Sequence, residues 1–320
     1  MKRSDNMAVI LVNPNIDLTT LIASATVNPG DVLLLEDGVY NQSVNISKNY
    51  LRIVARGRNA IFNGGNTLAD AFILTNVQGV EIRGITIMDY TDDGIQLTAG
   101  FAHRILNNKI IRVGNRGIAL IRSNSNFILR NQFAQASYGI RVETSDGNVI
   151  IQNKVSHCIN DGIEVLPSND TTNYFIGNFA EKCGGNGLEI SGIGNFIWKN
   201  VAVGNSLNGL RAFFGNNNVV IENISKDNAG DAFMFSDVNG YMYNNVFENN
   251  SESGIDLSGD YNIILNNLIA CNKDNGININ AGADFNTISN NILRYNTPTQ
   301  INNNGANNNF IDNTLINTDF

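Results

Sequence analysis

Apolar and polar residues alternate in short stretches along most of the chain, and the pattern repeats about every 22 residues. Each repeat carries a glycine, an apolar residue, a variable residue and a second apolar residue, as in Gly94-Ile95-Gln96-Leu97. Successive copies begin 22 to 25 residues apart. Their first positions are Gly94, Gly117, Gly139, Gly162, Gly187, Gly209, Ala232, Gly254 and Gly276. Repetition at a fixed period of this length indicates a repeat architecture.

Two columns of polar residues, mostly asparagine, follow the same period. The first column is Asn108, Asn131, Asn153, Asn178, Asn200, Asn223, Asn245, Asn267, Asn291 and Asn313. The second, five residues ahead of the first, is His103, Asn126, Asn148, Asn173, Asn195, Asn218, Gly240, Asn262, Asn286 and Asn308. Coils stacked at the ~4.8 Å strand spacing of a sheet place equivalent residues above one another, so these amides are expected to form hydrogen-bonded ladders.

Three short strands with alternating sides fit into each repeat, whereas a helical period of 3.6 residues is absent. We therefore predict an all-β fold, a right-handed parallel β-helix, which is a single-stranded solenoid of about 11 or 12 coils. Residues 1–50 are assigned to an N-terminal cap and first coil, and residues 51–320 to one continuous β-helix domain. A short helix over residues 18–25, with Asp17 as its N-cap, is expected to cover the open N-terminal end. No such cap is evident for the last coil, residues 308–315.

The opening coils are less regular, and their strands are expected at Val32–Leu35, Val44–Ile46, Leu51–Val54, Phe72–Leu74 and Val80–Ile87.

Composition agrees with a fold made of many tight turns. The chain has 30 glycines, 4 prolines and only 16% charged residues. The net charge of −8 argues against nucleic acid as a partner, because phosphate binding favours a basic face. No apolar run is long enough to span a membrane, and no signal peptide is evident. Localisation therefore stays open between the cytoplasm and a surface reached by a non-classical route.

The pattern resembles the pectate-lyase-like right-handed parallel β-helix superfamily. The resemblance rests on the asparagine and Gly-Ile columns, and on the segment from Asn28-Pro29-Gly30-Asp31 to Gly38-Val39-Tyr40. It extends over residues 17–315 and implies the fold more strongly than a function, since the superfamily contains lyases, hydrolases, uronate epimerases and non-catalytic members. The resemblance also implies that the Gly-Ile-x-Leu strand forms the floor of a substrate groove.

The variable position of that strand and the residue before its glycine are expected to face solvent. In the middle coils these positions gather charged and aromatic residues. The candidate catalytic residues are Glu164, Glu189, Arg141, Arg211 and Asp161. The candidate substrate-binding residues are Tyr138, Arg116, Glu143, Phe213 and His157.

Two glutamates stacked on adjacent coils repel each other, which separates their pKa values and leaves one acid and one base. Glycoside hydrolysis uses such a pair, while lyase or epimerase chemistry needs a base and a cation beside the sugar carboxylate. Arg141 and Arg211 are candidates for that cation, and Tyr138 and Phe213 for stacking on sugar rings. The alternative is a ladder of cross-strand ion pairs, Arg141–Glu164 and Glu189–Arg211, that only stabilises the sheet.

Other candidate signals are weaker. The Asp92-Asp93 doublet is typical of a turn, with calcium as the alternative, and no metal ligand or other cofactor is assigned. His103 lies in a ladder column, where a structural hydrogen bond is expected. Cys158 and Cys183 each follow a ladder asparagine by five residues, so they are expected to stack as buried thiols.

The residues that flank the inward apolar position between the two asparagine columns should point outward, yet many are apolar, from Phe127 and Leu129 to Ile263 and Leu265. A stripe of this length predicts a homo-oligomer, with a trimer favoured over a dimer. The alternative is that a turn of the chain covers the stripe, or that these positions face the core. Two functions remain open. One is a carbohydrate-binding or carbohydrate-active protein of the lyase, hydrolase or epimerase kind. The other is a non-catalytic structural or surface protein, so the sequence does not decide whether the protein is an enzyme.

Overall fold

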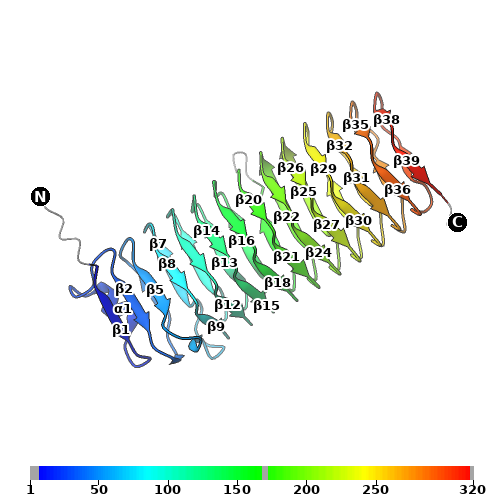
Figure 1. The fold of residues 1–320 in the computed structure, drawn as a ribbon. Helices are drawn as coiled ribbons and strands as arrows, with labels where there is room; N and C mark the ends of the chain where they lie inside the picture. Colours follow the sequence, from blue (N-terminus) through cyan, green and yellow to red (C-terminus); the bar gives the residue numbers. More distant parts are fainter. Residues whose placement is uncertain (1–6, 168–171, 318–320) are drawn as a thin grey trace, which may run out of the picture. The chain divides into compact units, whose positions relative to one another are not determined.

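A computed structural model describes residues 7–167 and 172–317. The chain divides into two compact units, residues 1–149 and 150–320. In each unit the strands form three parallel sheets, here called A, B and C, and each coil between the first and the last contributes one strand to each sheet in turn (Figure 1). The solenoid makes about 13 turns, slightly more than the 11 or 12 expected. The predicted all-β parallel β-helix is therefore confirmed.

The first unit begins with β1 and the helix α1, and every later strand pairs with its equivalent in the next coil. Sheet A of this unit contains β1 (Val9–Val12), β2 (Val32–Leu35), β5 (Arg52–Ala55), β8 (Glu81–Arg83), β11 (Arg104–Leu106) and β14 (Phe127–Leu129). Sheet B contains β3 (Gly38–Tyr40), β6 (Ala60–Asn63), β9 (Thr86–Met88), β12 (Lys109–Ile111) and β15 (Gln132–Ala134). Sheet C contains β4 (Val44–Ile46), β7 (Phe72–Thr75), β10 (Ile95–Thr98), β13 (Arg116–Ile121) and β16 (Tyr138–Glu143).

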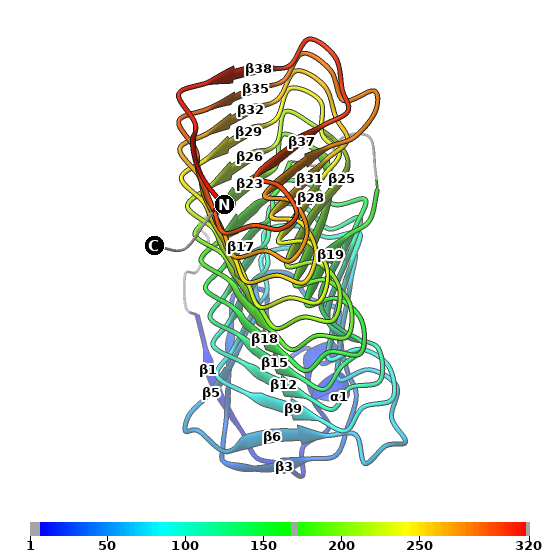
Figure 2. The same ribbon diagram turned by 90° about the vertical axis from the view of Figure 1, so that its right-hand side faces the viewer.

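The second unit is more regular, and its sheet A strands are seen one above another in Figure 2. Sheet A contains β20 (Tyr174–Ile176), β23 (Phe196–Trp198), β26 (Val219–Ile221), β29 (Tyr241–Tyr243), β32 (Ile263–Leu265), β35 (Thr287–Ser289) and β38 (Asn309–Ile311). Sheet B contains β18 (Lys154–Ser156), β21 (Phe179–Glu181), β24 (Val201–Val203), β27 (Ile224–Lys226), β30 (Val246–Glu248), β33 (Leu268–Ala270), β36 (Ile292–Arg294) and β39 (Thr314–Ile316). Sheet C contains β19 (Ile163–Val165), β22 (Leu188–Ile193), β25 (Leu210–Asn216), β28 (Phe233–Phe235), β31 (Ile255–Leu257), β34 (Ile277–Ile279) and β37 (Ile301–Asn303). The strand β17 (Val149–Ile151) contains the boundary between the units.

Alternation along each strand sends one set of side chains into the core. In sheet A of the second unit, Phe175, Ile197 and Val220 are buried, while their neighbours on either side are partly exposed. Equivalent residues follow one another along the stack, since Phe175 pairs with Ile197 and Ile197 with Val220. The core is therefore a set of apolar columns, as the sequence pattern predicts.

Asparagine ladders connect the turns between the sheets. In the second unit, the backbone N–H of Asn200 donates to Oδ1 of Asn223 over 2.8 Å, and its side-chain amide donates to the same oxygen over 3.1 Å. The amide of Asn223 donates in turn to the Ile197 carbonyl oxygen over 2.9 Å. Each amide thus satisfies backbone groups that would otherwise be buried without partners.

The ladder that starts five residues earlier in each coil is interrupted at Gly240. Asp237 of the same coil places a fully buried carboxyl group near this gap, beside Asn218. Neither oxygen of that carboxyl has a hydrogen bond of ordinary geometry among the described residues. Burial raises the pKa of Asp237 to about 7, and the nearby Asn218 amides lower it only in part.

The two ends of the solenoid differ. At the N-terminal end α1 (Leu18–Ala23) begins after Asp17, whose side chain accepts a hydrogen bond from the Thr20 N–H over 2.7 Å, and Leu18 is buried. In the last coil, Phe310 and Leu315 occupy inward positions, in register with buried Ile288 and Leu293, yet they are 39% and 50% exposed. The capping helix and the uncovered last coil both agree with the sequence.

Some expected boundaries need correction. The expected strand Val80–Ile87 is two strands, β8 and β9, separated by a turn at Gly84, where φ is +75°. Glycine adopts this conformation without the strain that a side chain would add. The helix ends at Ala23 rather than at residue 25. Strand β5 is shifted by one residue relative to the expected Leu51–Val54.

Within the described parts of the chain, no helix has the length and apolar character needed to cross a membrane.

Candidate functional site

The Gly-Ile-x-Leu strands of the second unit bring several of the expected site residues into one column of sheet C. Glu164 on β19 pairs in register with Glu189 on β22, and Glu189 pairs with Arg211 on β25. Strand alternation fixes this placement, because the residues that flank the glutamates point into the core; they are Ile163, Val165, Leu188 and Ile190. The predicted stacking of the two glutamates is therefore present.

Glu189 lies at the centre of a hydrogen-bonded charge cluster. Its Oε2 is 3.0 Å from Nη1 of Arg211 and accepts a hydrogen bond from the Asn186 amide over 2.7 Å. The Arg211 guanidinium also lies over the Phe213 ring, 4.4 Å from its centroid. The guanidinium is thus held between a carboxylate and an aromatic face, with 26% of its side chain exposed.

Asp161 lies at the edge of this cluster, and its carboxyl group has a raised pKa. Burial raises its pKa to about 6, and the negative charge of Glu189 adds to the shift. Hydrogen bonding by Asn186 and the charge of Arg211 act in the opposite direction. The backbone N–H of Asn186 donates to Oδ1 of Asp161. Asp161 therefore changes charge closer to neutral pH than an ordinary aspartate does.

Not all expected positions face solvent. The residues before the repeated glycines are expected to point outward, but Asp161, Asn186 and Asp93 are all buried. They lie where the chain turns into sheet C, and their side chains bond to the backbone of neighbouring coils instead. Glu164 is also buried, with 8% exposure. His157 is exposed after β18, and its imidazole makes no hydrogen bond or ion pair among the described residues.

Four of the expected substrate-binding and catalytic residues lie together in the first unit, on β13 and β16. Arg116 forms a bidentate pair with Asp93 at 2.7 and 2.9 Å and a further contact of 3.0 Å with Glu143. Arg141 lies 3.5 Å from the same Glu143 oxygen and 4.8 Å from the Tyr138 ring centroid. These contacts form an ion-pair network of the kind that stabilises a sheet. Of the pairs in the expected salt-bridge ladder, Glu189–Arg211 is present at 3.0 Å.

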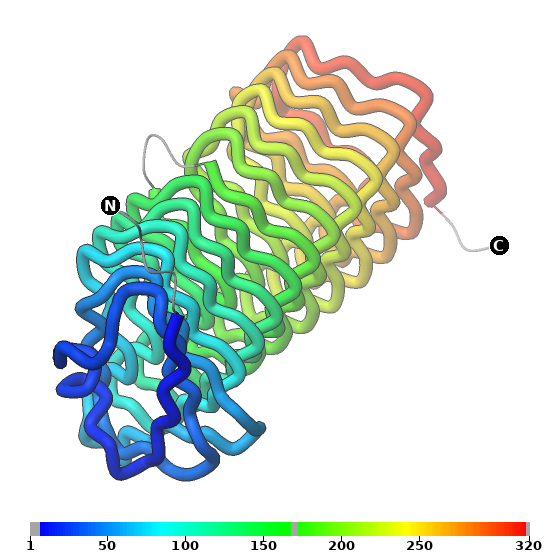
Figure 3. Tube along the Cα trace, turned by 60° about the vertical axis from the view of Figure 1, so that its left-hand side comes forward, coloured from blue at the N-terminus to red at the C-terminus, as the bar shows by residue number. Residues whose placement is uncertain are grey.

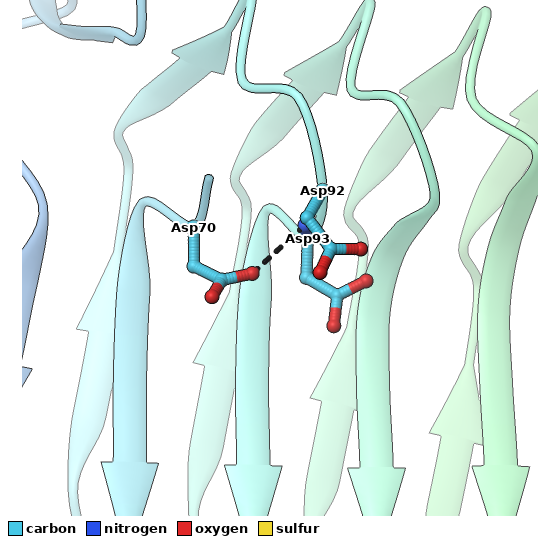
Figure 4. Close-up of side chains that lie close together, drawn as sticks. All are labelled: Asp70, Asp92 and Asp93. Carbon is cyan, nitrogen blue, oxygen red and sulfur yellow. Dashed lines mark hydrogen bonds between the residues drawn. The ribbon is translucent and has the colours of Figure 1, made fainter. Parts of the chain in front are cut away.

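Asp93 belongs to the group of three carboxylates drawn in Figure 4. The side-chain oxygens of Asp70, Asp92 and Asp93 lie within 4.8 Å of one another. Asp70 accepts a hydrogen bond from the backbone N–H of Asp93 over 3.0 Å. Oxygen donors of this kind suit a hard divalent cation such as calcium. Arg116, however, occupies both oxygens of Asp93, so a cation would compete with an existing ion pair.

The sequence pattern does not reveal two of these partners. Asn186 is expected among the outward residues, and its bond to Glu189 depends on side-chain packing that alternation does not specify. Asp70 lies 22 residues before Asp92, and this spacing of one coil is the signal that could have placed the two carboxylates together.

The fold and the site define the class of protein, a right-handed parallel β-helix of the pectate-lyase-like kind. The family model described as "Periplasmic copper-binding protein (NosD)" matches residues 20–209, and one described as "Right handed beta helix region" matches residues 168–316. Because the first match covers more than half of the chain, the chain belongs to the NosD family. No curated protein sequence matches it.

Solved structures with the same fold include two proteins that act on polysaccharides and one adhesin. The A-module of the Azotobacter vinelandii mannuronan C-5 epimerase AlgE6 has 16% identity and a TM-score of 0.63, with 95% of each chain covered. Pectate lyase Pel9A has 17% identity and a TM-score of 0.61, covering 73% of this chain and 76% of that one. The Streptococcus pneumoniae surface protein and adhesin PfbA has 11% identity and a TM-score of 0.56, covering 89% and 90%. At these identities the likeness establishes the fold alone.

Proposed function

We propose that this protein binds or modifies a carbohydrate through the sheet C face of its second unit. The observation that carries the proposal is the cluster of Asp161, Glu189, Arg211 and Phe213, which combines a titrating acid, a carboxylate, a cation and an aromatic ring. The similarity in fold to an epimerase and a pectate lyase supports a carbohydrate as the ligand.

Each residue has a role that matches its surroundings. Arg211 offers a partly exposed guanidinium for a sugar carboxylate, and Phe213 offers a ring face beside it. Asp161, whose pKa is raised to about 6 by burial, is the proposed proton donor, and Glu164 and Glu189 are the carboxylates proposed to act with it. Asp161 lies at the turn into sheet C, close to the glutamates on β19 and β22. An acid and a base placed close together serve hydrolysis or proton abstraction beside a carboxylate, and the reaction itself stays open among lyase, hydrolase and epimerase.

The test is glycan-array binding by the full chain, compared with the double variant Glu164→Gln and Glu189→Gln. We expect the variant to bind its glycan at least tenfold more weakly, a change of about 1.4 kcal/mol. Glu248→Gln is the matched control, because Glu248 lies on sheet B of the same unit. Unchanged binding by the double variant would remove this site from consideration.

A second candidate function is that of a rigid surface or structural protein without catalysis. The short connections between coils support it, since binding grooves are commonly built from long loops (Figure 3). A similar fold in an adhesin is consistent with this use. If the parent protein binds no glycan at all on the array, this second function is favoured.

The family description names copper as a ligand, and the donor chemistry of this chain does not fit it. Copper favours imidazole and sulfur donors. Within the described residues, the one group of at least three histidine, cysteine, aspartate or glutamate side chains is Asp70, Asp92 and Asp93, which offers only carboxylates. His103 is buried in a ladder position, where its Nδ1 accepts a hydrogen bond from the Val80 N–H. No step of the proposed function passes through copper.

The apolar stripe on sheet A supports a proposal about assembly. Tyr174, Phe196 and Trp198 in the second unit point outward and are at least partly exposed, in the parity that the sequence predicts. We propose that a second and third copy of this chain cover the stripe, since exposed apolar surface of this extent is unusual for a monomer. A monomeric mass by light scattering at micromolar concentration would refute the assembly.

A further inference from the structure

Charge is distributed unevenly between the two units. Residues 1–149 contain 14 lysines and arginines against 12 aspartates and glutamates, whereas residues 150–320 contain 7 against 17. The first unit is therefore slightly basic within a chain of net charge −8. This excess is of interest because it includes cations that line a single groove.

The groove lies where sheet A turns into sheet B in the first unit and has a volume of about 360 Å³. Its polar lining includes Arg58, Thr86, Asn107, Lys109, Arg130 and Gln132. Gly84, Asn107 and Arg130 occupy the same turn position in three successive coils, each with positive φ. The missing side chain at Gly84 leaves the groove open in the first of these coils.

The cations of the groove can be reached by a ligand. Arg58, Lys109 and Arg130 are all exposed. No carboxylate of the described residues lies within ion-pair distance of Arg58 or Lys109. At the Gly57 end the groove adjoins Glu36 and Asp37. Glu36 pairs with Arg56 at 3.9 Å, and Asp37 accepts hydrogen bonds from Asn59.

We propose that this groove binds an anionic polysaccharide, one whose sugars carry carboxylates, along the stack of coils. The cations come from three of four successive coils, with Arg58 two coils before Lys109 and Arg130 one coil after it. They therefore follow the direction in which the coils stack, which suits an extended polymer that carries several charges. Guanidinium groups bind carboxylates in bidentate fashion, and the amides of Asn107 and Gln132 are suited to sugar hydroxyls. The groove has no aromatic residue in its lining on which a nucleic-acid base would stack.

This inference deepens the proposed function, because it rests on a carbohydrate as the ligand and names its charge. It uses different residues in a different unit, so the two ideas can fail separately. A groove of this kind would hold an acidic chain without performing chemistry on it.

The test measures binding of oligogalacturonate to the full chain by calorimetry, with a neutral malto-oligosaccharide and a single-stranded oligonucleotide as comparison probes. The variant Arg58→Gln, Lys109→Gln and Arg130→Gln is expected to bind oligogalacturonate at least tenfold more weakly than the parent. Raising the salt concentration is expected to weaken binding to the parent, since exposed charges are screened. The control Lys182→Gln, Lys226→Gln and Lys273→Gln removes the same charge from the second unit and should bind as the parent does.

Unchanged binding by the groove variant, no binding by the parent, or equal binding of the neutral sugar would each overturn the proposal. Tighter binding of the oligonucleotide would overturn the assignment of the ligand class. If Glu164→Gln with Glu189→Gln binds oligogalacturonate normally while the groove variant does not, the groove stands although the sheet C site fails. Circular dichroism of the variants confirms that these exposed substitutions leave the fold intact.

Discussion

Asp237 carries a carboxyl group in a place where its charge is costly. It is fully buried beside the gap that Gly240 leaves in an asparagine ladder. Because its pKa in the folded protein is about 7, well above the ordinary value of 3.8, the folded state holds a proton that the unfolded chain releases. The contribution of Asp237 to the stability of the folded protein is therefore greatest below about pH 4, and it falls as the pH rises to 7.

We predict that Asp237→Asn stabilises the protein at pH 8, on the order of 2–4 kcal/mol, and changes little at pH 4. The amide is neutral at both pH values, so the cost of ionisation disappears. Thermal unfolding at the two pH values measures the difference. The exposed Asp227→Asn serves as control, and an equal change in both variants would contradict the explanation.

Asp161 gives a second prediction at the level of a single residue. With its pKa raised to about 6, it loses its proton as the pH passes through 6, well above the range of an ordinary aspartate. Glycan binding or turnover at the sheet C face is expected to follow an ionisation near pH 6. Asp161→Asn should remove this step from the pH profile. A profile that keeps the step in the variant would assign it to another group.

Individual residues are predicted well where the repeat alone decides their place. The register of Glu164, Glu189 and Arg211 follows from counting along the sequence. Burial does not follow, because Asp161 and Asp93 lie at turns where the chain leaves the strict alternation of a strand. The alternation of inward and outward residues along a strand does not predict which side chains are buried at these turns.

The asparagine ladder is the element on which the turns of the second unit depend. Asn223 accepts from both the N–H and the amide of Asn200, and donates to the carbonyl oxygen of Ile197. Removal of its side chain leaves several buried polar groups without partners.

We predict that Asn223→Ala lowers the free energy of unfolding by about 3–5 kcal/mol, since each buried group left unpaired costs roughly 1–3 kcal/mol. Urea denaturation of the full chain measures the loss. Asn304→Ala, at an exposed position near the C-terminal end, is expected to have little effect. Equal losses in the two variants would mean that the ladder contributes no more than any surface amide.

The sequence predicts two ladders, and the structure contains a third. Asn205, Asn228 and Asn250 bond in succession at the turn from sheet B to sheet C, with N–H to Oδ1 distances of 2.9 and 3.1 Å. This column continues directly into Cys183, whose N–H donates to Asn205, and then to the adjacent Cys158. The sequence predicts that the two thiols stack. It does not predict that the asparagines in the same column form a ladder, because cysteine replaces asparagine in two of the coils.

For the molecule as a whole, the last described coil, residues 301–316, is less well covered than the internal coils. Strands β37, β38 and β39 pair on one side only, and Phe310 and Leu315 lack a covering layer. Unpaired edges of this kind open more readily than internal strands and also attract other strands.

We predict that backbone amides of residues 301–316 exchange hydrogen much faster than those of internal coils such as residues 219–248. Hydrogen exchange followed by mass spectrometry measures the difference. Protection of the last coil equal to that of the internal coils would show instead that another chain covers this end, and dilution would then remove the protection.

The ladders also make the length of the solenoid adjustable in whole coils. Most coils of the second unit offer equivalent carbonyl and amide groups to the neighbouring coil. Joining Asn218 directly to Tyr241 would therefore remove one complete coil, including Asp237 and Gly240, while the remaining strands meet equivalent partners. A shortened chain would keep its strand register and differ only in the length of the solenoid. The length can therefore be changed in steps of one coil.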